Sequence, residues 1–177
     1  MSTPQLMLLV VMLMGGLGVI GSYAQGLISH PGSIKVLWGK ISGPFRTIYF
    51  ISMLLSALGY FAFAYYLLFR VDAATALVTN TLGFEVFFAA ITGMLLFSSL
   101  WMPFTYSYVD KPNKGTWLMI RVVLFLVALS SCALVWALLS LHDKTPPGPY
   151  WVAVVGDGYF ALHTTMLDAF LWPVLYR

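Results

Sequence analysis

Charged residues are scarce in this chain. Asp, Glu, Lys and Arg make up only 8% of its 177 residues, whereas 60% are hydrophobic. Soluble domains carry about 25% charged residues, so this deficit excludes an ordinary soluble domain. The apolar runs are also far longer than the roughly 10-residue strands of a membrane barrel. The composition therefore predicts an all-α integral membrane protein.

Cysteine and the common catalytic motifs are equally sparse. The single cysteine, Cys132, lies in an apolar run, which excludes an intramolecular disulfide. There is no CxxC, HExxH, P-loop or GxSxG motif, and the three histidines are far apart. No metal site is assigned on this basis, and the cofactor stays unknown. The net charge of +3 is spread over several loops, which is not typical of nucleic-acid binding.

Long apolar segments dominate what is present. A spanning helix needs roughly 20 mostly apolar residues. Stretches rich in Pro, Gly, Asn and Asp, such as 110–115 and 143–149, separate the segments and predict turns. We expect one transmembrane domain over residues 1–177, with five helices at residues 5–24, 47–69, 82–101, 117–141 and 150–176.

The distribution of Lys and Arg predicts an orientation. Five crossings put the first loop, the third loop and the C-terminus on one side, which then carries seven positive residues: Lys35, Lys40, Arg46, Lys111, Lys114, Arg121 and Arg177. The other side carries two, Arg70 and Lys144. Positive charge marks the cytoplasmic face. We therefore expect the N-terminus outside and the C-terminus in the cytoplasm, with membrane lipids as neighbours; the kind of membrane is not indicated.

The last apolar segment carries three ionisable residues, Asp157, His163 and Asp168. An Asp near the centre of a spanning helix costs at least ~2.5 kcal/mol, so such residues normally face the protein interior and are functional candidates. At about 100° per residue, Asp157 and Asp168 fall on one helix face. His163 falls about 120° away, on a second face. We expect neighbouring helices to cover both faces.

The expected depth of the ionisable residues in the membrane predicts two groups. Arg121 and Asp168 both fall in the inner third and are expected to form an ion pair; the alternative is that Arg121 extends to the interface. Glu85, Asp157 and His163 are expected to line a ligand pocket. Alternatively, Glu85 is an exposed residue at a helix start, and His163 packs in the core. The predicted aromatic walls of the pocket are Trp101, Trp136, Tyr159 and Phe160.

Three short stretches resemble the tryptophan-rich sensory protein/translocator protein (TspO) family. Residues 43–49 (GPFRTIY) are similar to the family's GPvWtxLY, with Arg46 at the Trp position. Residues 101–103 (WMP) are similar to WsP, with Ser98 where the family has Asn, and residues 149–150 are similar to the PY that opens the fifth helix. The likeness implies a five-helix bundle, a porphyrin- or sterol-like ligand inside it, and a homodimer.

The sequence is compatible with three functions. A protein that binds or transports a small hydrophobic ligand accounts for the 16% aromatic content together with a few polar groups at depth. A membrane enzyme would use acid/base chemistry on a lipid- or isoprenoid-like substrate, with Asp157 or Glu85 as the acid and His163 as the base. A structural subunit of a membrane complex would use its polar residues only to fix helix packing.

Overall fold

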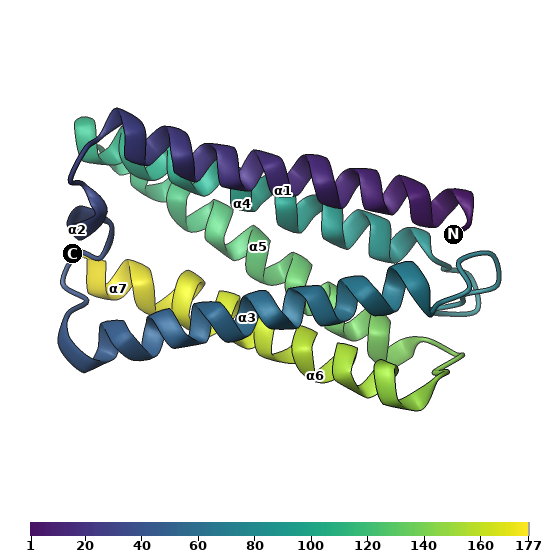
Figure 1. Ribbon diagram of the computed structural model, residues 1–177. Coiled ribbons are helices and arrows are strands. Elements are labelled where there is room, and N and C mark those ends of the chain that lie inside the picture. The colour runs from purple at the N-terminus through teal and green to yellow at the C-terminus, as the bar shows by residue number, and fades with distance from the viewer. Residues whose placement is uncertain (177) are drawn as a thin grey trace.

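The computed structural model describes residues 1–176, and over that range the chain is all-helical without a β-strand. A short helix, α2 (Ile34–Leu37), lies in the first connection. Arg177, whose charge contributes to the predicted orientation, lies outside the described residues. Figure 1 shows the four long helices: α1 (Thr3–Ser29), α3 (Gly43–Phe69), α4 (Glu85–Asp110) and α5 (Lys114–Ser140).

These four helices have the length and composition of membrane spans. Each has 26 or 27 residues, which at 1.5 Å per residue is about 40 Å and exceeds the ~30 Å hydrocarbon core. Many large apolar side chains on their outer faces are exposed, as lipid contact requires. The prediction of an all-α, multi-pass membrane protein is confirmed to the extent of four candidate spans.

The long helices run past the predicted apolar segments at several ends. The Asn113 side chain accepts from Thr116 N over 2.8 Å and caps α5, which therefore starts before the apolar run at Trp117. Pro103 lies inside α4 and lacks an N–H donor. The helix nevertheless continues to Asp110, so the predicted end at residue 101 is too early.

The last segment differs from the single α-helix predicted for residues 150–176. It consists of α6 (Pro147–Leu162), the π-helical segment η1 (His163–Leu171) and α7 (Trp172–Tyr176), which follow one another directly. Pro173 offers a physical reason. In a regular α-helix its ring presses on the carbonyl of Ala169, and a wider turn before it relieves this contact. Among the described residues, this segment is not one of the four long apolar spans.

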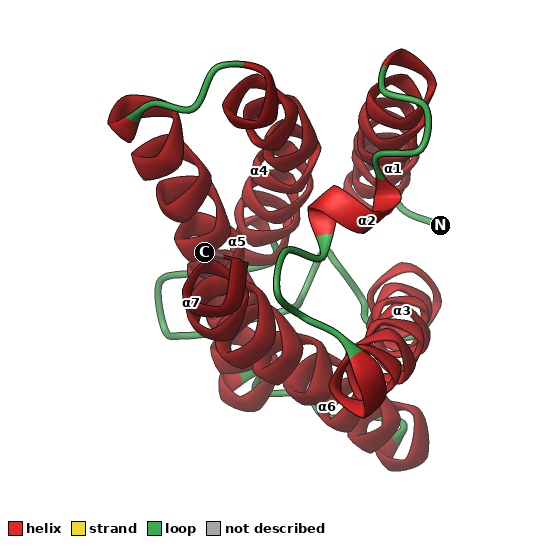
Figure 2. Cartoon of the chain, turned by 90° about the vertical axis from the view of Figure 1, so that its left-hand side faces the viewer, coloured by secondary structure: helices red, strands yellow, loops and turns green. Residues whose placement is uncertain are grey.

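The helices pack in a ring, in which one of the pairwise contacts is weak. α1 packs on α4, α4 on α5, α5 on α6 and η1, and α6 on α3, whereas α3 and α1 touch only slightly. The end view in Figure 2 shows α1 and α3 standing apart, with α2 lying across the end of the bundle between them. The two chain ends lie at opposite ends of the bundle (Figure 1).

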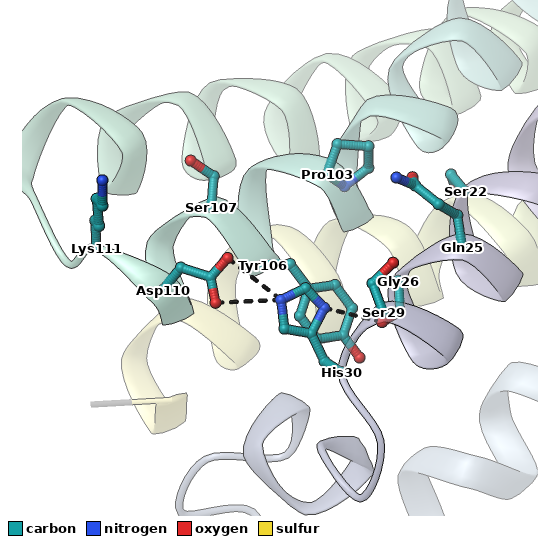
Figure 3. Close-up of a pocket in the computed structure, with 10 residues that line it drawn as sticks. All are labelled: Ser22, Gln25, Gly26, Ser29, His30, Pro103, Tyr106, Ser107, Asp110 and Lys111. Carbon is teal, nitrogen blue, oxygen red and sulfur yellow. Dashed lines mark hydrogen bonds and ion pairs between the residues drawn. The ribbon is translucent and has the colours of Figure 1, made fainter.

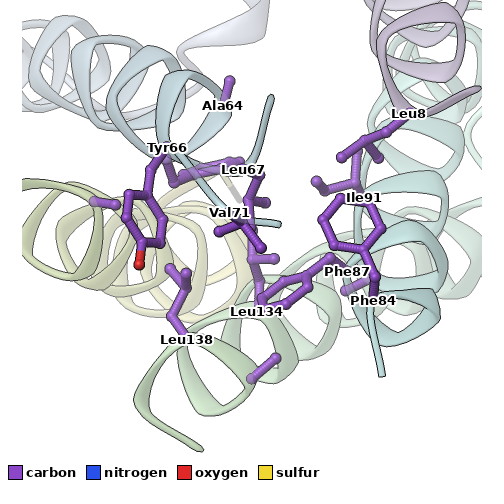
Figure 4. Packing of buried hydrophobic residues seen from close by; sticks show 14 of the residues in the cluster. Leu8, Ala64, Tyr66, Leu67, Val71, Phe84, Phe87, Ile91, Leu134 and Leu138 are labelled. Carbon is purple, nitrogen blue, oxygen red and sulfur yellow. The ribbon is translucent and has the colours of Figure 1, made fainter. Parts of the chain in front are cut away.

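Two apolar clusters hold the bundle together. The larger one lies toward the N-terminal end of α1 and joins α1, α3, α4 and α5 through side chains such as Leu8, Leu67, Phe87 and Leu134 (Figure 4). There the Gln5 side chain donates to Val71 O over 2.8 Å and ties α1 to the end of α3. The smaller cluster lies at the other end of the bundle and contains Ile41, Tyr49, Trp117, Ile120, Leu124 and Trp172.

Candidate functional site

The π-helical segment brings two ionisable side chains together. In η1 the backbone follows an i→i+5 ladder, so residues five apart lie over one another. His163 Nε2 consequently lies 3.6 Å from Asp168 Oδ1. The α-helical spacing predicts different faces for these two residues, and that prediction is wrong because the segment is not an α-helix.

α3 and α6 supply the partners of this pair. Tyr49 OH donates to Asp168 Oδ1. Ser52 Oγ lies 2.8 Å from His163 Nδ1, and Tyr159 OH donates to Ser52 Oγ over 3.0 Å. Tyr49 and Ser52 are three residues apart and therefore share one face of α3. These five residues, Tyr49, Ser52, Tyr159, His163 and Asp168, are called the polar cluster below.

The polar cluster is internal to the bundle. Tyr49, Ser52 and His163 are all less than 9% exposed. The side chain of Asp168 keeps 27% of its surface accessible, more than the 5% of His163. Asp168 is thus the more accessible member of the pair, and the hydroxyl groups and the imidazole beside it form a continuous set of donors and acceptors.

Aromatic rings from three other elements adjoin the polar cluster. Tyr23 of α1 lies within electrostatic range of both Asp168 and Tyr49. Its ring centroid is 5.6 Å from that of Trp101 on α4, which is in turn 5.6 Å from Trp172 on α7. The buried Nε1 of Trp101 has no hydrogen-bond acceptor among the described residues. This wall therefore offers apolar ring surface together with one free donor.

The connection between α1 and α3 covers the polar cluster from the end of the bundle. The ring of Trp38 meets Tyr49 edge-on, with centroids 5.6 Å apart. Trp172 Nε1 donates to Leu37 O over 3.0 Å, and Lys40 N donates to Leu175 O over 3.2 Å. These contacts close that end of the bundle, whereas α1 and α3 touch only slightly along its side.

Two faces of α1 differ in how closely they are packed. A Cβ at Gly15 would lie 2.8 Å from Leu95 on α4, whereas a Cβ at Gly16 would meet no atom within 4 Å. Gly16 and Tyr23 are seven residues apart and share one helix face. The face of α1 that carries Tyr23 is therefore not filled at Gly16, while the face toward α4 is tightly packed.

Four of the predicted site residues lie in or near this region. Tyr159 and His163 belong to the polar cluster, and Trp101 lies in the adjoining aromatic wall. Phe160 packs further along the bundle, with its ring centroid 6.2 Å from that of Phe63. Of these four residues His163 is buried and the other three are partly buried; their contact with a ligand stays a prediction.

Two other predicted residues lie elsewhere. Glu85 is exposed at the start of α4, where its carboxylate accepts from Gly83 N over 2.7 Å. Because α4 packs on α1 and α5 rather than on α6, Glu85 does not stand opposite Asp157. Trp136 is 47% exposed on α5. The structure therefore does not assemble the predicted pocket from these residues, and Glu85 has the helix-start role that the sequence left open.

The predicted ion pair between Arg121 and Asp168 is not formed within residues 1–176. Arg121 is exposed on α5, which agrees with the alternative that its long side chain reaches toward the interface. Asp168 faces Tyr49 and His163 instead. Widening of the helix at η1 turned Asp168 away from the position that α-helical spacing assigns to it.

Asp157 stands apart from the polar cluster. It is fully buried on α6, and neither carboxyl oxygen has a hydrogen-bond partner among the described residues. Its neighbour Gly156 contacts Gly59 of α3, and a step of about 100° turns Asp157 away from that contact. Ser56 Oγ is buried without a partner as well. Asp157 remains a predicted site residue without an assigned partner.

Sequence reasoning did not name Tyr23 and Ser52 as site residues, and it noted Tyr49 only through the TspO likeness. A signal was present on α3. Tyr49, Ser52 and Ser56 follow an i, i+3, i+7 pattern, which marks one polar face on an otherwise apolar helix. All three are buried. No comparable pattern on α1 identifies Tyr23, because its place in this region depends on contacts with residues of other helices.

Known proteins add no assignment to this geometry. No protein-family model matches the chain, and neither a curated protein nor a solved structure matches it. Within residues 1–176, no three His, Cys, Asp or Glu side chains gather in a way that could hold a metal ion.

Proposed function

We propose that this protein is a five-span membrane protein that binds or transports a small, flat hydrophobic ligand inside its helix bundle. The observation that carries the proposal is the polar cluster: five hydrogen-bonding side chains, inside a bundle of apolar helices, beside a wall of aromatic rings. Small-molecule sites typically combine mostly apolar and aromatic walls with a few placed polar groups. In this proposal α6, η1 and α7 together form the fifth span.

The ligand lies between α1, α3 and η1. Its rings contact Tyr23 and Trp101, and its polar group faces Asp168 and Tyr49. The ligand enters from the bilayer between α1 and α3, because α2 covers the end of the bundle and because α1 is not packed at Gly16. Lateral entry suits a molecule that partitions into lipid.

The TspO likeness supports a ligand of the porphyrin or sterol class. Two of its positions, Tyr49 and Trp101, are distant in sequence and come together beside Asp168 and Tyr23. A homodimer, which the likeness implies, belongs to the same proposal. The support is the convergence of these positions on one region, since no matching family shows it independently.

Ligand titrations test this function. We expect protoporphyrin IX to quench the tryptophan fluorescence of the detergent-solubilised protein, and a sterol to compete with it. Tyr49→Phe and His163→Phe should each weaken binding about tenfold, the loss expected for one strong hydrogen bond. Trp136→Phe, on the outer face of α5, is the matched control and should bind like the wild type. Equal affinities in all four proteins would place the ligand elsewhere, and absence of binding by either class would contradict the ligand assignment.

An enzymatic role is the second candidate, because of one specific arrangement. Ser52 Oγ, His163 and Asp168 stand in the order nucleophile, base and orienting carboxylate, with distances of 2.8 and 3.6 Å. Such a set activates a serine hydroxyl when His takes its proton. The second distance is long for a hydrogen bond, although catalytic contacts are often loose without substrate.

A serine-directed reagent separates the two roles. If Ser52 is activated, a fluorophosphonate will label the wild type in membranes, and Ser52→Ala will abolish the label. Ser99→Ala removes a serine on α4 outside the polar cluster and should leave labelling unchanged. An unlabelled wild type would reject the activated serine while leaving the ligand-binding proposal intact.

Orientation belongs to the same proposal. Five spans place the N-terminus outside and the C-terminus in the cytoplasm, given the seven-to-two division of positive residues. A protease-cleavable tag at each end, probed in sealed vesicles of known sidedness, should be cut from opposite sides. Cleavage of both tags from the same side would reject a fifth span.

A further inference from the structure

A polar pocket of about 370 Å³ lies between the last turns of α1 and α4, at the end of the bundle where α1 and α4 both terminate. Figure 3 shows its lining side chains. His30 is held by contacts on two sides. Its ring stacks on Tyr106 with centroids 4.2 Å apart, and its Nε2 lies 3.1 Å from Asp110 Oδ1. Its Nδ1 lies 3.0 Å from Gly26 O. The volume is within the range of ligand sites.

The pocket faces outward, away from the polar cluster. Gln25, Ser29, Ser107 and Lys111 of its lining are exposed, and no residue of the polar cluster lines it. Because both helices end here, the pocket lies at the level of the lipid headgroups on one membrane surface. It is thus a site separate from the ligand region inside the bundle.

The pocket offers donors and acceptors that no protein group uses. The side chains of Gln25 and Ser29 are exposed and form no hydrogen bond within residues 1–176. Lys111 adds an ammonium group with three donors. Asp110 adds a carboxylate, whose side chain stays 56% accessible. His30 approaches that carboxylate from one side, and a carboxylate has about four acceptor positions, so part of its capacity faces the pocket.

We propose that this pocket binds the headgroup of a phospholipid that carries both a phosphodiester and a primary ammonium, as phosphatidylethanolamine does. The phosphate accepts from Lys111, the headgroup ammonium donates to Asp110, and Gln25 and Ser29 supply further donors at the other end of the pocket. Adjacent positive and negative groups of the protein match the adjacent negative and positive groups of the headgroup. The outward-facing position lets the acyl chains lie along the apolar outer faces of α1 and α4.

Native mass spectrometry of the detergent-solubilised protein tests the proposal with three lipids. Phosphatidylethanolamine should bind at least about tenfold more tightly than phosphatidylcholine, whose quaternary ammonium cannot donate a hydrogen bond. Phosphatidylglycerol, which has the phosphate but no ammonium, should also bind more weakly. Equal binding of all three, or strongest binding of phosphatidylglycerol, would overturn the proposal.

Single substitutions test which side chain binds the phosphate and which binds the ammonium of the headgroup. Asp110→Asn should remove the preference for phosphatidylethanolamine over phosphatidylcholine, whereas Lys111→Gln should weaken both lipids about tenfold. Lys114→Gln, on α5 at the same end but outside the pocket, is the control and should change neither. Asn at position 110 can still accept from His30, and Ser29→Ala, at a side chain without a partner, gives a second variant that leaves the fold contacts in place. Unchanged affinities in Asp110→Asn, Lys111→Gln and Ser29→Ala would reject the site.

A soluble competitor distinguishes the source of the ligand. Glycerophosphoethanolamine has the same headgroup without acyl chains. It should compete only at concentrations far above those of the lipid, since the acyl chains also contact the protein. Competition at equal concentrations would show that the pocket takes a soluble molecule, which would overturn the assignment to a membrane lipid.

Discussion

Replacing Gly59 by Ala is expected to destabilise the protein by about 3 kcal/mol, the upper part of the range for overpacking. A Cβ at position 59 would lie 2.2 Å from Gly156 O and 2.8 Å from Gly156 C. Both are backbone atoms, so no side chain can rotate away. α3 and α6 must therefore separate along the contact that also positions Ser52 against His163.

Two further glycines give variants with which the stability of Gly59→Ala can be ranked. A Cβ at Gly156 would meet Gly59 Cα at 3.0 Å, a milder clash, and a Cβ at Gly158 would meet no atom within 4 Å. Stability should fall in the order Gly158→Ala, Gly156→Ala, Gly59→Ala, measured as unfolding free energy in mixed SDS and mild detergent. If Gly59→Ala is as stable as Gly158→Ala, α3 and α6 do not pack at this point.

Energetic coupling between Tyr49 and Asp168 is the second large effect. Asp168→Ala leaves the buried Tyr49 hydroxyl without its acceptor, at a cost of about 1–3 kcal/mol. Tyr49→Phe removes the donor and should cost less, because Asp168 stays partly accessible and keeps His163 nearby. The loss of unfolding free energy in the double variant should therefore be smaller than the sum of the two single losses, by about 1–2 kcal/mol in a double-mutant cycle.

Arg121 provides the control for this cycle. It is exposed on α5 and forms no ion pair with Asp168 within the described residues. The losses in Arg121→Ala and Asp168→Ala should add, since the two side chains share no contact. Coupling between Arg121 and Asp168, with additivity between Tyr49 and Asp168, would restore the ion pair expected from sequence and contradict the contacts of the polar cluster.

Local properties of the chain were sufficient to predict the membrane class and the rough positions of the long helices. A run of some 20 apolar residues must form a helix in lipid, because every backbone donor and acceptor needs an internal partner there. The ends were less certain. Asn113 extends α5 by its cap, and α4 continues through Pro103, since neighbouring helices support turns that local rules treat as breaks.

The site was predicted in part because ionisable residues in an apolar segment are informative by themselves. His163 was identified in this way and lies in the polar cluster, together with Tyr159, which was predicted as part of the aromatic wall. The pairing of His163 with Asp168 could not be predicted, because it depends on the five-residue repeat of η1. Likewise, the depth of Glu85 and Arg121 along the membrane said nothing about which helix each one faces.

By itself, the sequence determined the all-α membrane build, since a hydrophobic content of 60% and long apolar runs restrict the chain whatever its partners are. It also determined that Asp157, His163 and Asp168 are the unusual residues of the last segment. Tertiary structure alone decided the partners of His163 and Asp168. Packing of α3 on α6 and η1 places Ser52 against His163, and the π-helical segment rotates Asp168 toward Tyr49. The physical reason is that hydropathy records the cost of burying each residue, whereas hydrogen-bond partners depend on the rotation and neighbours of each helix.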